Sequence, residues 1–237
     1  MITPLIILAY YDRPKMACNA LESIRRQVGP WNLAIIDDGS REPIRPIAED
    51  ILRDYLDRVT FYYISDTPEQ KLRQGGSRHG AYMNKAIDYL TGPDDPVVIL
   101  CDDDALYEGY IDSLRLYYEQ NPDIKWSYCH VSVFDPSKGP PVLGQRTPEH
   151  WLNRYSVPIA PSCQIDSSQV TYRASCISRH LEYPSPMTSE LDAYMFTLLT
   201  QQYGLCPFNG ITGQYKAVFF DTMGNRPIEE RYAPRIK

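Results

Sequence analysis

The chain has 237 residues, of which 43% are hydrophobic and 23% are charged, and its formal net charge at pH 7 is −6. This is an ordinary globular composition, so the chain as a whole is not disordered. The acidic balance excludes an overall basic surface for nucleic acid, although a local basic patch is still compatible with it. The length fits one large domain, or one domain with a short appendage.

The first half of the chain alternates apolar strands with amphipathic helices. Short apolar runs predict buried strands over residues 5–9, 33–36, 59–64 and 96–100. Helices are predicted over residues 14–26, in the proline-rich segment after residue 40, over residues 77–90 and over residues 108–120. Strands that alternate with helices predict a mostly parallel sheet covered by helices on both faces.

The pattern changes after residue 121. Strands are predicted over residues 126–134, 169–173 and 216–220, and a helix over residues 189–203 that ends at Gly204. The segment from 135 to 161 is rich in proline and glycine and predicts loops. We expect a single domain over residues 1–215, whose front half (1–121) and back half (122–215) bind different ligands. The last strand and the basic tail, residues 216–237, follow it as a lid or as a disordered end.

Six cysteines are scattered along the chain without any Cys-x-x-Cys pair. This pattern excludes a zinc ribbon and does not fit a disulfide framework, so we interpret most of the cysteines as small buried side chains. The apolar run at residues 5–9 has no basic leader and is too short for a signal peptide or a membrane span. We therefore expect a soluble, cytoplasmic protein with no transmembrane segment.

Polar or acidic clusters follow three of the predicted strands. They are residues 11–13 (Tyr-Asp-Arg), 37–40 (Asp-Asp-Gly-Ser) and 102–104 (Asp-Asp-Asp). Each cluster alone also fits a turn or a helix cap. Ligands of open α/β sheets bind beyond the carboxyl ends of the strands, however, and three adjacent carboxylates repel one another unless a cation or protons relieve them. Oxygen ligands favour Mg²⁺ or Mn²⁺, so we expect one of these ions with a diphosphate on its open positions.

Four segments resemble the family 2 glycosyltransferases, in the order and spacing of that family. Residues 6–14 and 20–25 resemble its first strand and helix, and residues 34–40 resemble its second strand with an Asp-Asp-Gly-Ser turn. Residues 75–87 resemble the segment before its metal motif, and residues 97–104 resemble the Asp-x-Asp motif itself. Asp12 and His79 depart from the family, which usually has Asn at both positions, and Asp12 alternatively caps the following helix.

The resemblance implies a GT-A fold of the α/β class, in which a mostly parallel mixed sheet is flanked by helices in one domain. It implies an inverting enzyme that moves a sugar from a nucleotide-diphosphate sugar, with a UDP-sugar as first choice, to an acceptor hydroxyl. Tyr11 stacks on the base in this interpretation, and Asp102 and Asp104 hold the ribose and the metal ion, Mn²⁺ or Mg²⁺. The donor-binding residues that the resemblance implies are Tyr11, Arg13, Asp37, Asp38, Arg78, Asp102 and Asp103.

An inverting transfer needs a carboxylate that takes the proton of the acceptor hydroxyl. By resemblance this residue lies at the start of a late helix, where Asp192 fits better by its spacing to Gly204 and Glu190 is the alternative. Either carboxylate also fits a helix cap. The residues expected on the acceptor side are Trp151, Tyr155 and Asp166. Packing under a loop, or the start of a turn, is an equal interpretation of these three.

Other activities stay open at this point. A Rossmann oxidoreductase requires Gly-x-Gly-x-x-Gly after the first strand, where this chain has Tyr-Tyr-Asp-Arg-Pro at residues 10–14. The same segment lacks the glycine-rich loop with which nucleotidyltransferases open. A metal-dependent phosphohydrolase and a non-catalytic module that binds nucleotide sugars remain alternatives. The acceptor is equally open: a glycan, a protein side chain, a small molecule or modified nucleic acid.

Overall fold

The computed structural model describes residues 2–65, 77–134, 144–146, 167–176, 191–204 and 206–217. The strands are β1 Leu5–Tyr10, β2 Asn32–Asp37, β3 Val59–Tyr63, β4 Pro96–Cys101, β5 Asp104–Leu106, β6 Trp126–Phe134, β7 Gly144–Arg146, β8 Val170–Arg173 and β9 Phe208–Ala217. The α-helices are α1 Pro14–Arg25, α2 Arg45–Ile51, α4 Ser77–Leu90, α5 Tyr110–Gln120 and α7 Leu191–Tyr203, and three short 3₁₀ helices are η1 Arg53–Arg58, η3 Ser167–Gln169 and η4 Ala174–Cys176.

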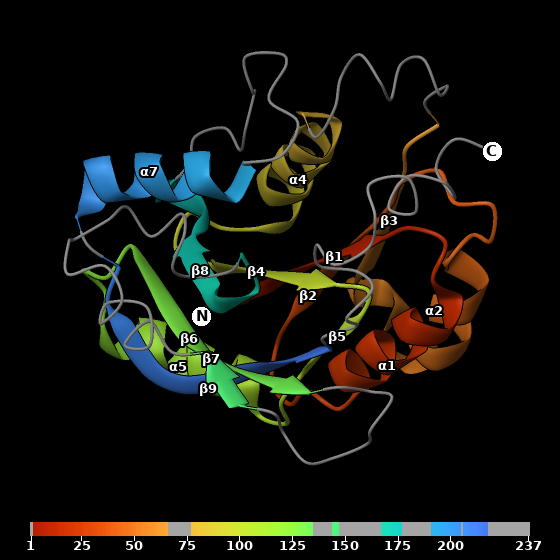
Figure 1. Ribbon diagram of the computed structural model, residues 1–237, viewed down its shortest axis with the longest axis horizontal. Helices are drawn as coiled ribbons and strands as arrows, with labels where there is room; N and C mark the ends of the chain where they lie inside the picture. The colour runs from red at the N-terminus through yellow and green to blue at the C-terminus, as the bar shows by residue number, and fades with distance from the viewer. Residues whose placement is uncertain are drawn as a thin grey trace.

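Within the described residues the strands form one mixed sheet of nine (Figure 1). Their order is β3-β2-β1-β4-β8-β6-β9-β5, and β7 pairs with β6 outside this path. The first four strands are parallel to one another. Beyond β4 the sheet becomes mixed, because β8 is antiparallel to β4 and β6, whereas β9 is parallel to β6 and antiparallel to β5. The predicted α/β architecture with a mixed sheet is therefore confirmed.

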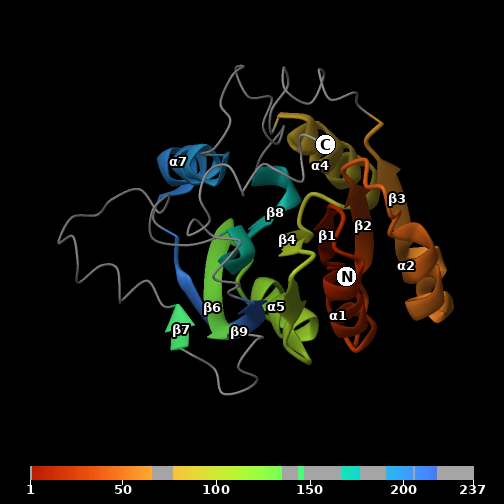
Figure 2. The same cartoon turned by 45° about the vertical axis from the view of Figure 1, so that its right-hand side comes forward.

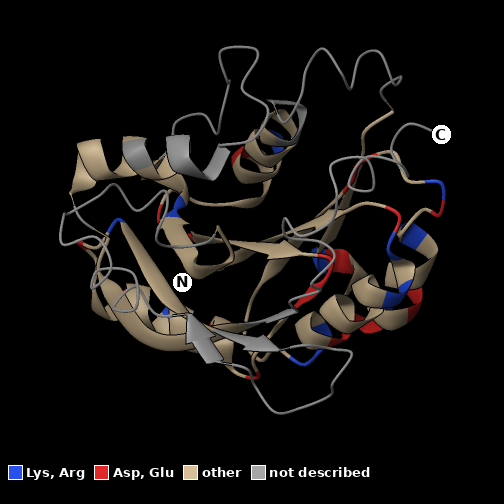
Figure 3. Ribbon diagram, viewed as in Figure 1, with Lys and Arg blue, Asp and Glu red and all other residues tan. Residues whose placement is uncertain are grey.

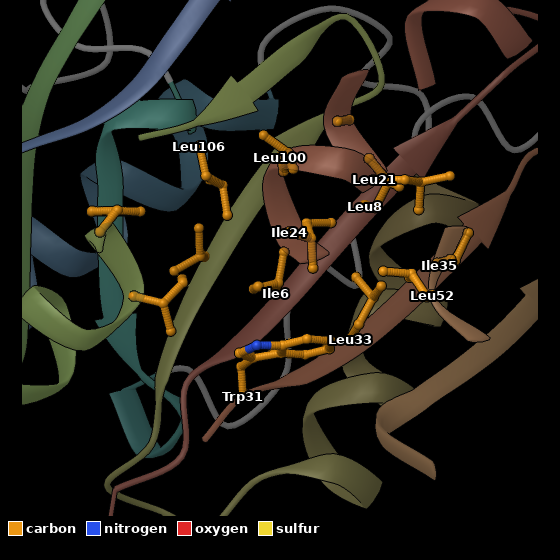
Figure 4. Close-up of a cluster of buried hydrophobic side chains, with 14 of the residues drawn as sticks. Ile6, Leu8, Leu21, Ile24, Trp31, Leu33, Ile35, Leu52, Leu100 and Leu106 are labelled. Atoms are coloured by element: carbon orange, nitrogen blue, oxygen red, sulfur yellow. The ribbon is translucent and has the colours of Figure 1, made fainter. Parts of the chain in front are cut away.

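Two apolar cores cover the two faces of the sheet. In β1, Ile6 and Leu8 face the core made with α1, α2 and α5, while Leu5 and Ile7 face the core made with α4 and α7. Figure 4 shows the first core, in which Trp31 closes one end of the cluster. Figure 2 shows α4 and α7 on the side of the sheet opposite to α1 and α2. Strands buried on both faces explain why their sequences are continuous apolar runs rather than alternating ones.

Most of the charged residues that the structure describes lie on the helices and on the loops at the strand ends (Figure 3). The four parallel strands carry one charged residue, Asp37, at the last position of β2. Helix α1 begins at Pro14 as predicted, because proline lacks the N–H that a first helical turn leaves unbonded. None of the helices that the structure describes is long and apolar enough to span a bilayer.

Most of the predicted elements of both halves are confirmed within one or two residues of their bounds. The last strand is a correction: β9 begins at Phe208, eight positions before the predicted start at Lys216, and so it crosses the boundary expected between residues 215 and 216. The short strand β5, which begins at Asp104, the last aspartate of the cluster at residues 102–104, was not predicted at all. All five cysteines of the described residues are free, as expected, but only Cys129 and Cys176 are buried. Cys18, Cys101 and Cys206 are partly exposed, so the expectation that most of the cysteines are buried is not met in this part of the chain.

Candidate active site

Three loops meet at the carboxyl ends of β1, β2 and β4, which are neighbours in the sheet. The backbone N–H of Tyr11 donates to the Oδ2 atom of Asp102 at 3.0 Å. The N–H of Asp38 donates to the carbonyl of Tyr10 at 3.0 Å, and the N–H of Asp12 donates to Ser40 Oγ at 3.1 Å. The three polar clusters that the sequence separates by tens of residues thus form one site.

Arg13 neutralises two of the three consecutive aspartates. Its guanidinium lies 2.5 Å from Asp102 Oδ1 and 2.6 Å from Asp103 Oδ2. Asp102 is almost fully buried, at 1% side-chain exposure, whereas Asp103 is 15% exposed and Arg13 is 36% exposed. Burial raises the pKa of Asp102 to about 6, although Arg13 and the Tyr11 N–H favour its charged form. For Arg13, burial lowers the pKa, but the charges of Asp102 and Asp103 outweigh burial and raise it.

Asp12 joins the first loop to the second. Its backbone φ is +49°, in the left-handed region that Asp tolerates better than most residues. Its Oδ1 accepts the N–H groups of Arg41 at 2.7 Å and Glu42 at 3.3 Å, and its Oδ2 accepts Arg41 Nε at 3.1 Å. Burial alone would raise the pKa of Asp12, but the hydrogen bonds from Arg41 outweigh it and lower the pKa. The suggestion that Asp12 caps α1 is wrong, because the N-cap residue is Arg13 and no side chain caps this helix.

Asp37 and Asp38 have different surroundings. Asp37 Oδ1 accepts the N–H of Ser40 at 2.9 Å, and its Oδ2 accepts the N–H of Ile44 at 3.3 Å. Both oxygens of Asp37 therefore hold the turn after β2 in place. Asp38 is also buried, at 7% exposure, and follows β2 directly at the edge where the three loops meet.

One group of side chains in the described part of the chain has the composition of a metal site. A ligand atom from each of Cys101, Asp103 and Asp104 lies within 4.8 Å of the other two. Two carboxylates suit Mn²⁺ or Mg²⁺, and the thiol adds a softer ligand, so the donor set fits a divalent ion. Asp102, which the resemblance paired with Asp104, directs its carboxylate to Tyr11 and Arg13 instead.

The side chains of the other predicted site residues are not among those that the structure describes. Arg78 and Asp192 lie in the first turns of α4 and α7, where only the backbone is described. The remaining predicted residues lie outside the described ranges: Glu190, Trp151, Tyr155 and Asp166. Their roles stay predictions.

Two residues near the acidic triplet were missed by the sequence analysis. Cys101 ends β4 immediately before the triplet, and that position is a local signal that it belongs to the site. Lys216 pairs in register with Asp104 across β5 and β9. Nothing local in the sequence indicates this pairing, because the two residues are more than a hundred positions apart.

A parallel unit β3-β2-β1-β4, with a cluster of polar side chains at its carboxyl edge and a mixed second half, is the architecture of the GT-A glycosyltransferases. The sequence model of the family described as "Glycosyl transferase family 2" matches residues 5–127, which is more than half of the chain. The chain therefore belongs to the family 2 glycosyltransferases. A comparison with curated protein sequences finds no significant match.

Solved structures share this fold. The crystal structure of S. aureus TarS has a TM-score of 0.63 at 13% identity, covering 92% of this chain and 37% of TarS. TarS 1-349 in complex with UDP-GlcNAc has a TM-score of 0.62 at 12% identity, covering 92% of this chain and 59% of that one. Mannosyltransferase PcManGT from Pyrobaculum calidifontis, in complex with GDP-Man and Mn²⁺, has a TM-score of 0.58 at 15% identity, covering 98% of this chain and 59% of that one. The chain thus spans between about a third and three fifths of these proteins, and the likeness shows the fold.

Proposed function

We propose that this chain is a metal-dependent, inverting glycosyltransferase that moves a sugar from a nucleotide-diphosphate sugar to an acceptor hydroxyl. The observation that supports it most is the meeting of three polar loops at one edge of the sheet, around Tyr11, Asp38 and Asp102. An aromatic ring, buried carboxylates and a cation-binding group are what a base, a ribose and a diphosphate require. Membership of family 2 supports the transfer chemistry.

The donor in this proposal is a UDP-sugar. Solved relatives hold UDP-GlcNAc in one case and GDP-Man in another, so nucleotide-diphosphate sugars are common to both. Tyr11 stacks on the base, Asp38 accepts a hydrogen bond from the base or the ribose, and Arg78 approaches the diphosphate. Asp37 is a further candidate for the role given to Asp38, because each of its oxygens accepts one backbone N–H of its own loop and keeps a second lone pair.

Asp103 and Asp104, with the Cys101 thiol beside them, would hold Mn²⁺ or Mg²⁺. When bound, such an ion supplies positive charge to the departing diphosphate. In this proposal Asp102 accepts from a ribose hydroxyl, and the same carboxylate accepts the Tyr11 N–H that holds the first loop. The proposal thus assigns the ribose to Asp102 and the metal ion to Asp103 and Asp104, while Arg13 contacts both Asp102 and Asp103.

In this proposal the catalytic base lies in the back half of the chain. Asp192, in the first turn of α7, takes the proton of the acceptor hydroxyl, and Glu190 is the alternative. Trp151, Tyr155 and Asp166 form the acceptor side in this proposal. The tail after β9 serves as a lid, because β9 ends beside β5 and the acidic triplet. The acceptor is a glycan, a protein, a small molecule or modified nucleic acid.

Thermal shift with nucleotide sugars tests the proposal. We expect UDP-GlcNAc or UDP-glucose with Mn²⁺ to raise the unfolding temperature, since a ligand that binds only the folded state stabilises it, and EDTA to remove the effect. The variant Asp38→Asn tests whether the ligand occupies this site, and for it we expect a smaller rise in the unfolding temperature. No shift with any UDP- or GDP-sugar would refute nucleotide-sugar binding. UDP release at the same rate with and without candidate acceptors would favour the phosphohydrolase alternative instead.

A further inference from the structure

The backbone of Arg13 is fixed by hydrogen bonds, whereas its side chain is partly exposed at the site. The Arg13 carbonyl accepts the N–H groups of Met16 at 3.1 Å and Ala17 at 3.0 Å, which fixes its backbone as the N-cap residue of α1. The side chain is 36% exposed, and its guanidinium lies between Asp102 and Asp103, so these contacts and not the apolar core hold it in place. The two ion pairs therefore join a partly exposed guanidinium, on a residue with a fixed backbone, to Asp102 and Asp103.

Asp103 is a ligand for two different cations, the Arg13 guanidinium and the expected divalent metal ion. It is 2.6 Å from the Arg13 guanidinium, and it also belongs to the group of Cys101, Asp103 and Asp104 that fits a divalent ion. A divalent ion held by Asp103 would share this carboxylate with the guanidinium, and the two positive charges would repel each other because the site is partly shielded from water. Arg13 and the metal therefore compete for the same carboxylate.

We propose that Arg13 is a resident counter-cation that makes metal binding depend on the donor. Without a donor, Arg13 neutralises Asp102 and Asp103 and weakens the binding of the metal ion. The diphosphate of the donor brings negative charge that offers the guanidinium another partner, and this releases Asp103 to the metal. Metal and donor then bind with positive coupling, which by linkage is the same in either order of addition. The inference rests on the proposed function, and Arg13 acts in it as a positioning residue.

Mn²⁺ titration followed by electron paramagnetic resonance tests this inference without any assay of activity. The proteins are the unchanged chain, Arg13→Met, Arg13→Gln, Arg13→Lys and the control Arg41→Met, each titrated with and without UDP. Arg41 is a suitable control because it is 74% exposed and pairs with Asp12 on the neighbouring loop rather than with the triplet. Circular dichroism establishes that each variant is folded.

For Arg13→Met and Arg13→Gln we expect Mn²⁺ alone to bind about tenfold more tightly, because the competing charge is gone. The enhancement of Mn²⁺ affinity by UDP should shrink by a similar factor. Arg13→Lys keeps the charge and should keep most of the coupling, and Arg41→Met should match the unchanged chain.

Equal or weaker Mn²⁺ binding by both uncharged variants would overturn the inference, as would tighter binding with the UDP enhancement intact. These outcomes leave the proposed function standing if the unchanged chain binds Mn²⁺ together with UDP. If no protein in the series binds Mn²⁺ even with UDP, both the inference and the metal dependence in the proposed function are wrong. A merely structural Arg13 would weaken metal binding on removal, which is the opposite sign.

Discussion

The backbone N–H of Tyr11 donates a 3.0 Å hydrogen bond to the Asp102 carboxylate, across 91 positions of the sequence. The bond exists because β1 and β4 are parallel neighbours, so that both strands end at the same edge of the sheet. Asp102 is buried and also bound by Arg13, which leaves it little freedom to move. One carboxylate thereby fixes the backbone of the residue whose ring we expect to stack on the base.

Tyr11→Ala should weaken nucleotide binding. Stacking of one base on an aromatic ring contributes about 1–3 kcal/mol, which corresponds to a loss of roughly 5–150-fold in affinity. The backbone bond to Asp102 does not need the ring, so the unfolding temperature should change little. Calorimetric titration with UDP and Mn²⁺ measures the effect. Tyr63→Ala, at a tyrosine 53% exposed at the end of β3, is the control and should bind UDP normally.

Asp192→Asn should lower turnover and leave donor binding nearly unchanged. A positioned general base contributes about 10²–10⁴-fold to a rate, and asparagine cannot take the proton. Glu190→Gln is the matched comparison, because it lies two residues earlier in the chain. The measurement is the rate of UDP release with acceptor beside the affinity for UDP. Turnover at the rate of the unchanged chain in Asp192→Asn, with a loss in Glu190→Gln, would move the base to Glu190.

The strand-end clusters were predictable because the signals are local. Each parallel strand is buried on both faces and reads as a short apolar run, and the polar residues that follow it mark the edge of the sheet. The neighbourhood of residues 11, 38 and 102 then follows from the general rule for open α/β sheets. The rule does not say which partner each side chain takes, for example that Arg13 pairs with both Asp102 and Asp103.

The start of strand β9 was predicted wrongly because some of the residues that the strand buries are polar. Gln214 is fully buried and donates to the Ile99 carbonyl at 2.9 Å, and Asn209 is 9% exposed and donates to Ser127 Oγ at 3.2 Å. These residues remove the apolar pattern by which a buried strand is recognised, although their hydrogen bonds make the burial tolerable. Strand β5 has three residues and depends on β9 for pairing, so it has no signal of its own.

Arg173→Met should destabilise the fold strongly. Arg173 is 2% exposed, and its guanidinium donates to four backbone carbonyls, those of Asp94, Tyr118, Asn121 and Ile124. Removing the guanidinium takes a donor from all four carbonyls, at a cost of about 1–3 kcal/mol for each buried group that finds no other donor. The Asn121 carbonyl keeps the N–H of Ile124 at 3.1 Å.

Urea unfolding measures this loss, and we expect the free energy of unfolding to fall by at least about 3 kcal/mol. Arg173→Lys should recover only part of it, because an ammonium group cannot reach four carbonyls in the planar arrangement of a guanidinium. Arg53→Met is the control: Arg53 is 67% exposed and pairs with Asp50 on the surface, so its loss should stay within about 0.5 kcal/mol. A similar small loss for Arg173→Met would show that solvent reaches the four carbonyls.

Gly213→Ala should also destabilise the chain, through crowding rather than through backbone conformation. A Cβ atom at Gly213 would lie 2.5 Å from Cys129 Sγ and 2.9 Å from two ring atoms of Tyr110, all of them buried. The added methyl group must push β9 away from β6 and α5, and overpacking of this kind costs about 1–3 kcal/mol. Gly204→Ala separates the two causes, because Gly204 has a φ of +81° and no atom within 4 Å of its Cβ position. That variant should lose about 1–2 kcal/mol from the left-handed conformation alone. The double variant Gly213→Ala with Cys129→Ala should recover part of the Gly213→Ala loss in urea unfolding, and no recovery would place the strain at Tyr110.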